Sequence, residues 1–277
     1  MIVKTLDNFK IVTRNDDAYD MADDLSTLVR SLNISPPPPN FYREKMPGRN
    51  GSVRVGMDYD ERVLTAVCTL FGEDYLDFLL RRNRLINVLT SGEPFYIVTD
   101  AEPGKRWDVE VANDWTPNKI GASGDFTIQF VSASSYCEAV GKTTDPLTFD
   151  SGLWQFGQGL ISEDVSYVHT TNRFDIYNAG LEIDPREVYL KIIYTGASSN
   201  LKLKNHTTGE EWTYTGTSNT SDVIEIDRIR PVKNGLTIVR NTNKMPISLA
   251  PGWNDIEVIG TSGSFEITFD FRFIYFA

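Results

Sequence analysis

The chain is poor in the residues that most often carry catalysis or bind metals. Its 277 residues include only two histidines, His169 and His206. They are far apart, with no His-Glu-x-x-His motif and no paired cysteines beside them, which argues against a protein metal site. Neither a Gly-x-Ser-x-Gly nucleophile turn nor a phosphate-binding glycine pattern is present. We therefore predict no catalytic residues, no metal, no cofactor and no enzymatic activity.

Cysteine is equally scarce, since Cys68 and Cys137 are the only two. Two cysteines are too few for a disulfide framework in a chain of this length. Cys68 shares one face of the expected strand with Leu64, Ala66 and Leu70, and the β-branched residues between them occupy the other face. A free cysteine behaves as a small hydrophobic residue, so we predict a buried structural thiol at this position.

An excess of positive charge and long apolar runs are also missing. The 27 basic residues are outnumbered by 38 acidic ones, which gives a net charge of −11. A sequence-independent nucleic-acid binder needs a basic surface, so we predict no specific nucleic-acid binding. No stretch approaches the ~18–20 apolar residues of a membrane span, and the first twelve residues contain no apolar run typical of a signal peptide. We expect synthesis in a cytoplasm and no membrane insertion.

Two groups of carboxylates suggest chemistry, but their spacing does not support it. Glu210 and Glu211 are neighbours, so on a strand they point to opposite faces and cannot flank a sugar as a glycosidase requires. An acidic run near the N terminus resembles a calcium loop but lacks the glycine at its sixth position and the glutamate at its twelfth. We interpret that run as a solvated acidic segment; its members are Asp16, Asp17, Asp20, Asp23 and Asp24.

Turn and strand signals dominate what is present. Pro47-Gly48 and Asn50-Gly51 stand back to back and leave only Arg49 between them. Each glycine accepts the positive φ that such turns require, so the pattern predicts a tight loop with Arg49 at its tip. Residues 62–70 then alternate with a period of two, which predicts a well-covered strand. A helix is expected from Glu73-Asp74 to Leu89.

The remaining sequence predicts short strands in two domains. A single core stops growing near ~250–300 residues, so two domains of about 140 residues each are expected. Gly141 to Pro146 has the composition of a linker, and we place the domains at 1–140 and 141–277. The second half contains strands separated by polar turns, as in a β-sandwich. Candidates include 147–149, 187–195, 200–205, 211–215, 222–227, 255–259 and 265–276.

The order of these elements resembles the distal tail protein of long-tailed bacteriophages. The resemblance rests on the run PGRNG at 47–51, the strand 62–70, the helix, the strand FTIQF at 126–130 and the closing segment 249–276. It implies a mainly β fold with an N-terminal ring-forming domain that carries one α-helix and a C-terminal galectin-like β-sandwich. A tract of prolines, Pro36 to Pro39, departs from that pattern, and its path is not predicted.

The resemblance also implies a structural role. The first domain would form a hexameric ring at the tail tip of the virion, joining the tail tube protein to the tail-tip protein, while the second would hold receptor-binding proteins. Pro47, Gly48, Arg49, Asn50 and Gly51 would then lie near contacts between subunits, and Arg49 could bind a carboxylate of the next subunit. A solvent-facing turn arginine is the alternative.

A carbohydrate-binding module is the second hypothesis for the C-terminal half. Sandwich domains that bind sugars place pyranose rings on exposed aromatic side chains, although most tryptophans in such domains are packed. The candidate stacking residues are Trp212, Tyr214 and Trp253, with Trp253 directly after the turn Pro251-Gly252. An exposed aromatic ring beside hydrogen-bonding side chains would distinguish this hypothesis from the first.

Overall fold

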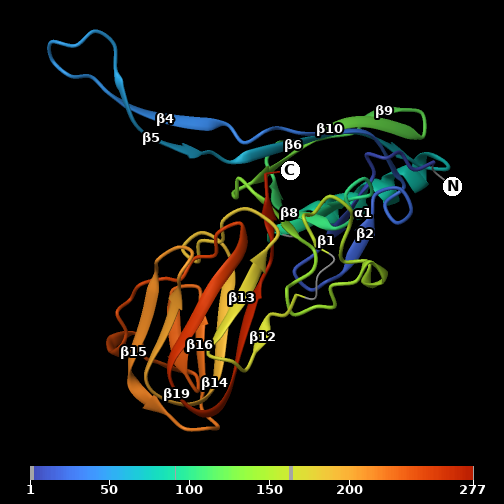
Figure 1. The fold of residues 1–277 in the computed structure, drawn as a ribbon. Coiled ribbons are helices and arrows are strands. Elements are labelled where there is room, and N and C mark those ends of the chain that lie inside the picture. The colour runs from blue at the N-terminus through green and yellow to red at the C-terminus, as the bar shows by residue number, and fades with distance from the viewer. Residues whose placement is uncertain (1–2, 91, 162–164, 277) are drawn as a thin grey trace. The chain divides into compact units, whose positions relative to one another are not determined.

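A computed structural model describes residues 3–90, 92–161 and 165–276 (Figure 1). The described chain is mainly β-strand with one α-helix, as predicted. It divides into two compact units, the first reaching Glu138 and including Phe276, the second spanning Ala139–Tyr275. The assignment of 1–140 and 141–277 as functional domains stays a prediction.

The first unit is built on one antiparallel sheet with the strand order β2-β1-β7-β8-β10-β6-β3. The short strand β9 (Asn118–Ile120) pairs with β10, and β11 (Cys137–Ala139) follows it along the chain. The strands of the sheet are β1 (Phe9–Val12), β2 (Ala18–Asp20), β3 (Thr27–Ile34), β6 (Arg62–Phe71), β7 (Phe95–Thr99), β8 (Lys105–Val111) and β10 (Ser123–Ser132).

Strand β6 confirms the alternating pattern read from the sequence. It lies between β3 and β10, and one of its faces is completely buried, with Leu64, Ala66, Cys68 and Leu70 each 0% exposed. Burial raises the pKa of the Cys68 thiol to about 12, because a thiolate would lose its hydration there. The thiol is therefore a packed structural group, as predicted.

Helix α1 (Tyr75–Leu89) begins where the polar start signal predicts. Asp74 is the N-cap residue, and its side chain accepts a hydrogen bond of 2.8 Å from the backbone N–H of Asp77. Phe78, Leu85 and Leu89 are buried on the side that faces the sheet. The opposite side stays in solvent, so the helix is attached through one stripe of side chains.

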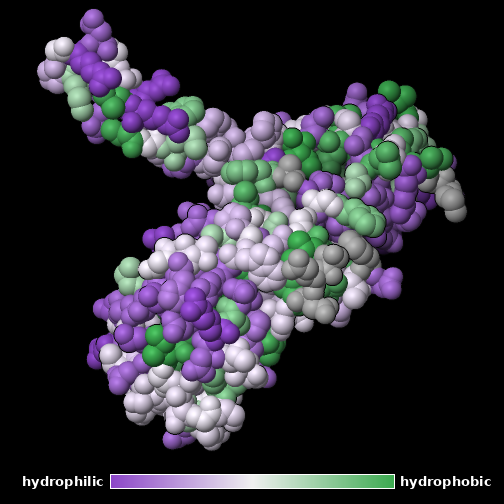
Figure 2. Space-filling model, viewed as in Figure 1, coloured by the Kyte–Doolittle hydropathy of each residue, from purple (hydrophilic) through white to green (hydrophobic). Residues whose placement is uncertain are grey.

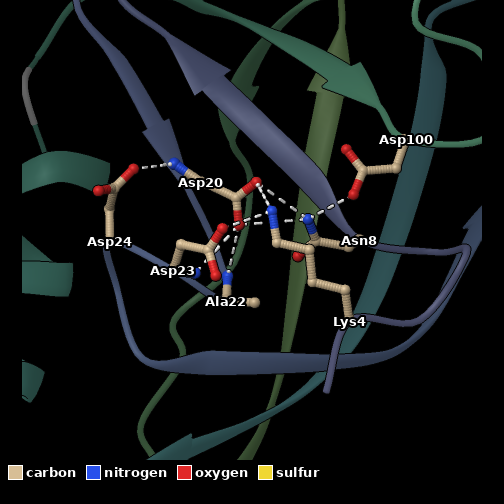
Figure 3. Close-up of polar contacts among 7 residues, drawn as sticks. All are labelled: Lys4, Asn8, Asp20, Ala22, Asp23, Asp24 and Asp100. Atoms are coloured by element: carbon tan, nitrogen blue, oxygen red, sulfur yellow. Dashed lines mark hydrogen bonds and ion pairs between the residues drawn. The ribbon is translucent and has the colours of Figure 1, made fainter. Parts of the chain in front are cut away.

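The acidic run near the N terminus is not uniformly solvated, which corrects the prediction for Asp20 (Figure 3). Asp20 is only 6% exposed. Its carboxylate accepts hydrogen bonds from Lys4 Nζ at 2.7 Å, from Asn8 Nδ2 and from the backbone N–H of Ala22. Asn8 Nδ2 also donates to Asp100 at 2.8 Å. A buried carboxylate needs such partners, and Lys4, distant in sequence, supplies the charge.

The second unit contains a sheet with the strand order β12-β19-β14-β16-β17-β18, with β13 on β19 and β15 on β14. β20 (Ile274–Tyr275) ends the unit, and the 3₁₀ helices are η1 (Phe149–Ser151) and η2 (Val239–Asn241). The strands of the sheet are β12 (Val168–His169), β13 (Arg173–Asn178), β14 (Leu190–Asn205), β15 (Glu211–Ser218), β16 (Val223–Asp227), β17 (Arg230–Lys233), β18 (Leu236–Thr237) and β19 (Gly252–Phe271).

Two long strands bend this sheet around a core. β14 pairs with β16 through residues 191–195 and with β15 through residues 198–204, across irregularities near Gly196 and Ser198. Bulges of this kind form the corners of β-sandwiches. The predicted strands 187–195 and 200–205 are therefore parts of one strand, as are 255–259 and most of 265–276. The predicted strand 147–149 was wrong, because η1 begins at Phe149.

Candidate assembly interface

Strands β4 (Pro39–Glu44) and β5 (Val53–Tyr59) form a hairpin that stands apart from the sheet of the first unit. They pair with each other, and in the described chain neither pairs with another strand. Figure 1 shows the hairpin, in blue, extending beyond the rest of this unit. An isolated two-stranded hairpin is marginally stable in water, so this one gains most from a surface supplied by another molecule.

The two glycines of the hairpin tip have the positive φ that the turn signals predict, but Asn50 does not, so Asn50-Gly51 is not the primed turn expected from the sequence. Gly48 and Gly51 have φ values of 80° and 84°, and the backbone N–H of Arg49 donates to the carbonyl of Met46 at 3.2 Å. All residues from Pro47 to Gly51 are exposed. Among the described residues, the Arg49 guanidinium has no ion-pair partner, so it is open to a contact with another molecule.

The sides of the hairpin expose an unusual amount of apolar surface. Figure 2 shows hydrophobic residues interspersed with hydrophilic ones along this segment. The guanidinium of Arg54 lies over the ring of Phe41, 4.6 Å from its centroid, and this cation–π contact helps to hold the Phe41 side chain in place. Exposed apolar surface on strands that keep a free edge is typical of an interaction site. The exposed large side chains are Phe41, Tyr42, Met46, Val55, Met57 and Tyr59, each 37–55% exposed.

The proline tract, whose path the sequence did not predict, forms the base of the hairpin. The backbone N–H of Ser35 donates to the carbonyl of Val63 at 3.1 Å, and that of Asp60 donates to the carbonyl of Pro38 at 3.0 Å. The tract therefore runs alongside residues 60–63. Because proline fixes its own φ and restricts the residue before it, this base is stiff.

Arg62 anchors the base to the first unit. It is 2% exposed, and its guanidinium lies over the ring of Trp107 at 4.5 Å. Nε donates to the carbonyl of Ser35 at 2.9 Å, and the guanidinium also donates to the carbonyl of Phe276. Burial lowers the pKa of Arg62, although an arginine still keeps its charge at neutral pH. The hairpin is thus an extension with a fixed root.

A second exposed apolar surface lies on helix α1. Leu76 and Leu80 are 68% and 69% exposed and are one helical turn apart. Tyr75 is 54% exposed, and Lys119 Nζ lies over its ring at 3.4 Å. Ile120, next along β9, is 71% exposed. We call Tyr75, Leu76, Leu80 and Ile120 the helix patch.

A groove of about 470 Å³ lies at the C-terminal end of the same helix. Its apolar lining includes Ile86, Leu89 and Phe95 from the helix and β7, and Trp115 beyond β8. Its acidic lining consists of Glu93, Glu110 and Asp114. The groove can therefore take an apolar side chain together with a cation. It was not predicted, because residues 86–95 and 110–115 meet only in the folded unit.

The structure distinguishes the three candidate sugar-stacking residues. Trp212 and Tyr214 are 2% and 4% exposed and point into the core of the second unit, so neither ring offers a face to a ligand. Those two positions were wrong as stacking candidates, because the alternation of β15 places both on its covered side. Trp253 is 43% exposed on β19. It alone of the three keeps an open ring.

The described residues also bear on metal binding and on membrane crossing. No group of three or more histidine, cysteine, aspartate or glutamate side chains in that part of the chain is arranged to hold a metal ion. None of its helices combines the length and the apolar character of a membrane-crossing helix.

Comparison with known proteins places the hairpin, β6, helix α1 and the groove in one domain. Residues 20–132 match the model of the phage tail protein RIFT-related domain. This segment, less than half of the chain, is similar to that domain. The resemblance to a phage tail protein found in the sequence is thereby confirmed. Of the segments that carry it, 47–51, 62–70, the helix and 126–130 lie inside the matched region, and the closing segment 249–276 lies outside it.

Solved structures of phage proteins share the fold of the whole chain. The crystal structure of Dit from phage SPP1, described as a paradigm of the hub adsorption apparatus of phages that infect Gram-positive bacteria, has 15% sequence identity and a TM-score of 0.69. That similarity covers 96% of this chain and 99% of SPP1 Dit. A chain of the phage p2 baseplate in its activated conformation has 12% identity and a TM-score of 0.50, over 96% and 97% of the two chains. A comparison with curated protein sequences gives no match.

Proposed function

We propose that the protein is a structural subunit of a phage tail tip, where six copies close into a ring that joins the tail tube to the tip or baseplate. The phage tail domain and the fold shared with SPP1 Dit support this role. The observation that carries it is the hairpin β4–β5, an exposed apolar extension with a fixed root and no strand partner in the described part of its own subunit.

A closed ring needs two different surfaces on each subunit, since every contact joins the front of one copy to the back of the next. The hairpin is the projecting surface. The helix patch and the acidic groove form the receiving surface, and both are apolar enough to gain free energy when water is excluded. Each subunit can then donate its hairpin to one neighbour and receive the hairpin of the other.

Charge complementarity supports this pairing. Between residues 43 and 54 the hairpin has the basic residues Arg43, Lys45, Arg49 and Arg54 and the single acidic residue Glu44. The groove has three acidic side chains. In our proposal Arg49 of one subunit binds the carboxylate of Glu110 in the groove of the next, a charge-assisted contact that also sets the register of the two subunits.

The proposal further assigns the second unit to the outside of the ring, where it holds receptor-binding components of the same virion. On this view the protein acts by geometry and not by catalysis. The acidic net charge of −11 suits a channel wall that must not retain DNA.

Light scattering after size exclusion, together with electron microscopy of negatively stained particles, tests the ring. We expect sixfold rings from the full chain, either alone or after co-expression with the neighbouring tail proteins. The double variant Leu76→Asp, Leu80→Asp should give monomers, because two charges would enter the apolar contact. Ile229→Asp, in a turn of the second unit where Ile229 is 59% exposed, is the matched control and should still form rings.

A charge exchange tests the pairing of Arg49 with Glu110. Arg49→Glu should weaken the ring, and Arg49→Glu combined with Glu110→Arg in one chain should restore it, because each interface then regains an opposite pair. Rings from the Leu76, Leu80 variant would contradict the receiving surface. A wild-type chain that stays monomeric at every concentration and beside its tail neighbours would contradict the ring itself.

A further inference from the structure

One face of the second unit combines exposed aromatic rings with a row of charged side chains. The outer face of β13 and β19 carries Tyr177 opposite Trp253, Asp175 opposite Asp255, and Arg173 opposite Glu257. The alternate residues Ile256 and Val258 of β19 are each 1% exposed and belong to the core. Because side chains alternate along a strand, the burial of Ile256 and Val258 fixes which residues point outward, and no binding partner is needed to expose them.

The two aromatic rings form a platform in which the tyrosine is held by a hydrogen bond. Their centroids are 5.0 Å apart with an angle of 55° between the planes. The Tyr177 hydroxyl donates to the carbonyl of Gly159 at 2.9 Å, which holds that ring in one position. Trp253 follows Gly252, whose φ is 83°, so the tryptophan sits where the chain leaves a turn and enters β19. The Tyr177 side chain, held by its hydrogen bond, loses little conformational entropy when a ligand binds to the platform.

The charged row beside the platform is arranged at some expense to stability. Asp175 and Asp255 lie directly opposite each other, and like charges at such positions destabilise a sheet. Arg173 compensates one of them by donating to both oxygens of Asp255, at 2.9 Å and 2.5 Å. Within the described chain, the side chain of Asp175 has no hydrogen bond or ion pair. A carboxylate oxygen is therefore left open beside an exposed ring.

We propose that this face binds a neutral saccharide, with one pyranose ring lying on Trp253 and its hydroxyl groups donating to Asp175 and Asp255. Residues two apart on a strand, such as Trp253 and Asp255, are about 6.8 Å apart. A sugar ring that lies on the tryptophan can therefore place its hydroxyl groups over the carboxylates. Arg173 supplies donors for a hydroxyl or ring oxygen. His206, which lies 2.8 Å from Glu257, extends the polar row.

The surroundings of Trp253 favour a sugar over a protein partner. The centre of a protein interface is depleted in charged residues, with aromatic anchors surrounded by other apolar side chains. Here the aromatic pair is bordered by carboxylates and a guanidinium, the mixture of an apolar face and orienting polar groups found in small-molecule sites. Three carboxylates against one arginine also disfavour anionic glycans, so the ligand class is a neutral hexose polymer.

Binding can be measured on the full chain with defined oligosaccharides. The probes are hexamers of β-1,4-linked glucose, N-acetylglucosamine and galactose, with hexagalacturonic acid as the acidic comparison. Affinity electrophoresis and tryptophan fluorescence report binding, since a sugar on Trp253 would move its emission to shorter wavelength. We expect at least one neutral hexamer to bind and the acidic one to bind at least tenfold more weakly.

Variants on the same face decide the mode of binding. Trp253→Ala should weaken binding at least tenfold, Trp253→Phe less, and Asp175→Ala about threefold to tenfold. Ile259→Ala is the matched control on the same strand, where Ile259 is 40% exposed, and should bind as wild type does. Thermal melting verifies that each variant is folded, and Asp175→Ala keeps the test valid if Trp253→Ala fails to fold. Absence of binding to every neutral hexamer, or full binding by Asp175→Ala and a folded Trp253 variant, would overturn the proposal.

Discussion

The hairpin β4–β5 and the outer face of β13–β19 both expose aromatic side chains, but their support is very different. β19 lies on a completed core, with Ile256 and Val258 each 1% exposed on its inner face. The hairpin has no covered face, because every residue of β4 is exposed and β5 is exposed over most of its length. A platform that is already folded can bind a small ligand, whereas an uncovered hairpin becomes ordered by joining a larger surface.

The largest expected effect is on the free energy of unfolding, when an apolar side chain is shortened on a buried strand and, for comparison, on the exposed hairpin. Leu64→Ala in the buried face of β6 should lower the free energy of unfolding by about 2–5 kcal/mol, because it leaves a cavity in a packed core. Val55→Ala in the hairpin, where Val55 is 55% exposed, should change monomer stability by less than about 0.5 kcal/mol. Urea denaturation of the two variants measures both values. Similar losses would mean that the hairpin is packed against its own subunit in solution.

The next effect concerns the hairpin tip. Gly51→Val should destabilise the tip by about 1–2 kcal/mol, because φ is 84° there and a β-branched residue resists that conformation. No neighbouring atom lies within 4 Å of the added Cβ, so backbone strain is the whole cause. Arg49→Ala should leave the melting temperature of the monomer unchanged and weaken the ring. Amide hydrogen exchange of the hairpin and light scattering separate these results; equal loss of monomer stability would make Arg49 part of the fold.

The smallest effect is a dependence on pH near the N terminus. Burial raises the pKa of Asp20, but hydrogen bonds from Lys4, the backbone N–H of Asp23 and Asn8 outweigh it, so the pKa lies below the ordinary 3.8. The carboxylate therefore stabilises the fold fully above about pH 4, and this contribution is lost as pH falls through the lowered pKa. Between pH 5 and pH 3 the wild type should lose more unfolding free energy than Asp20→Asn. Parallel urea titrations test this, and identical slopes would show that Asp20 is not coupled to folding.

Local signals were sufficient for some elements. The period-two pattern of residues 62–71, the turn glycines Gly48 and Gly51 and the helix start at Asp74 each depend on neighbours within a few residues. The family resemblance rested on the order of these elements, of the strand 126–130 and of the closing segment 249–276, and the matched region contains all but the closing segment. The strands β4 and β5 that flank the tip were not predicted, although Val53, Val55, Met57 and Tyr59 alternate. These two strands are exposed and pair only with each other. Their sequence therefore lacks the difference in hydropathy between a covered face and an open face by which a strand is recognised.

Which face is covered was decided only by tertiary contacts. Hydropathy suggests Trp253 inside and Asn254 outside, but Asn254 is 0% exposed and Trp253 is 43% exposed. The Asn254 amide holds the preceding turn, accepting from the N–H of Ala250 at 2.8 Å, and accepts from Asn205 at 3.1 Å. The same holds for Asp20, which is buried because Lys4 and Asn8 reach it.

The sequence by itself determined where strands, turns and the helix lie, since those depend on local periodicity and φ preferences. The tertiary structure alone decided which side chains meet, because hydrogen bonds between distant residues can outweigh the hydrophobic preference of a single position.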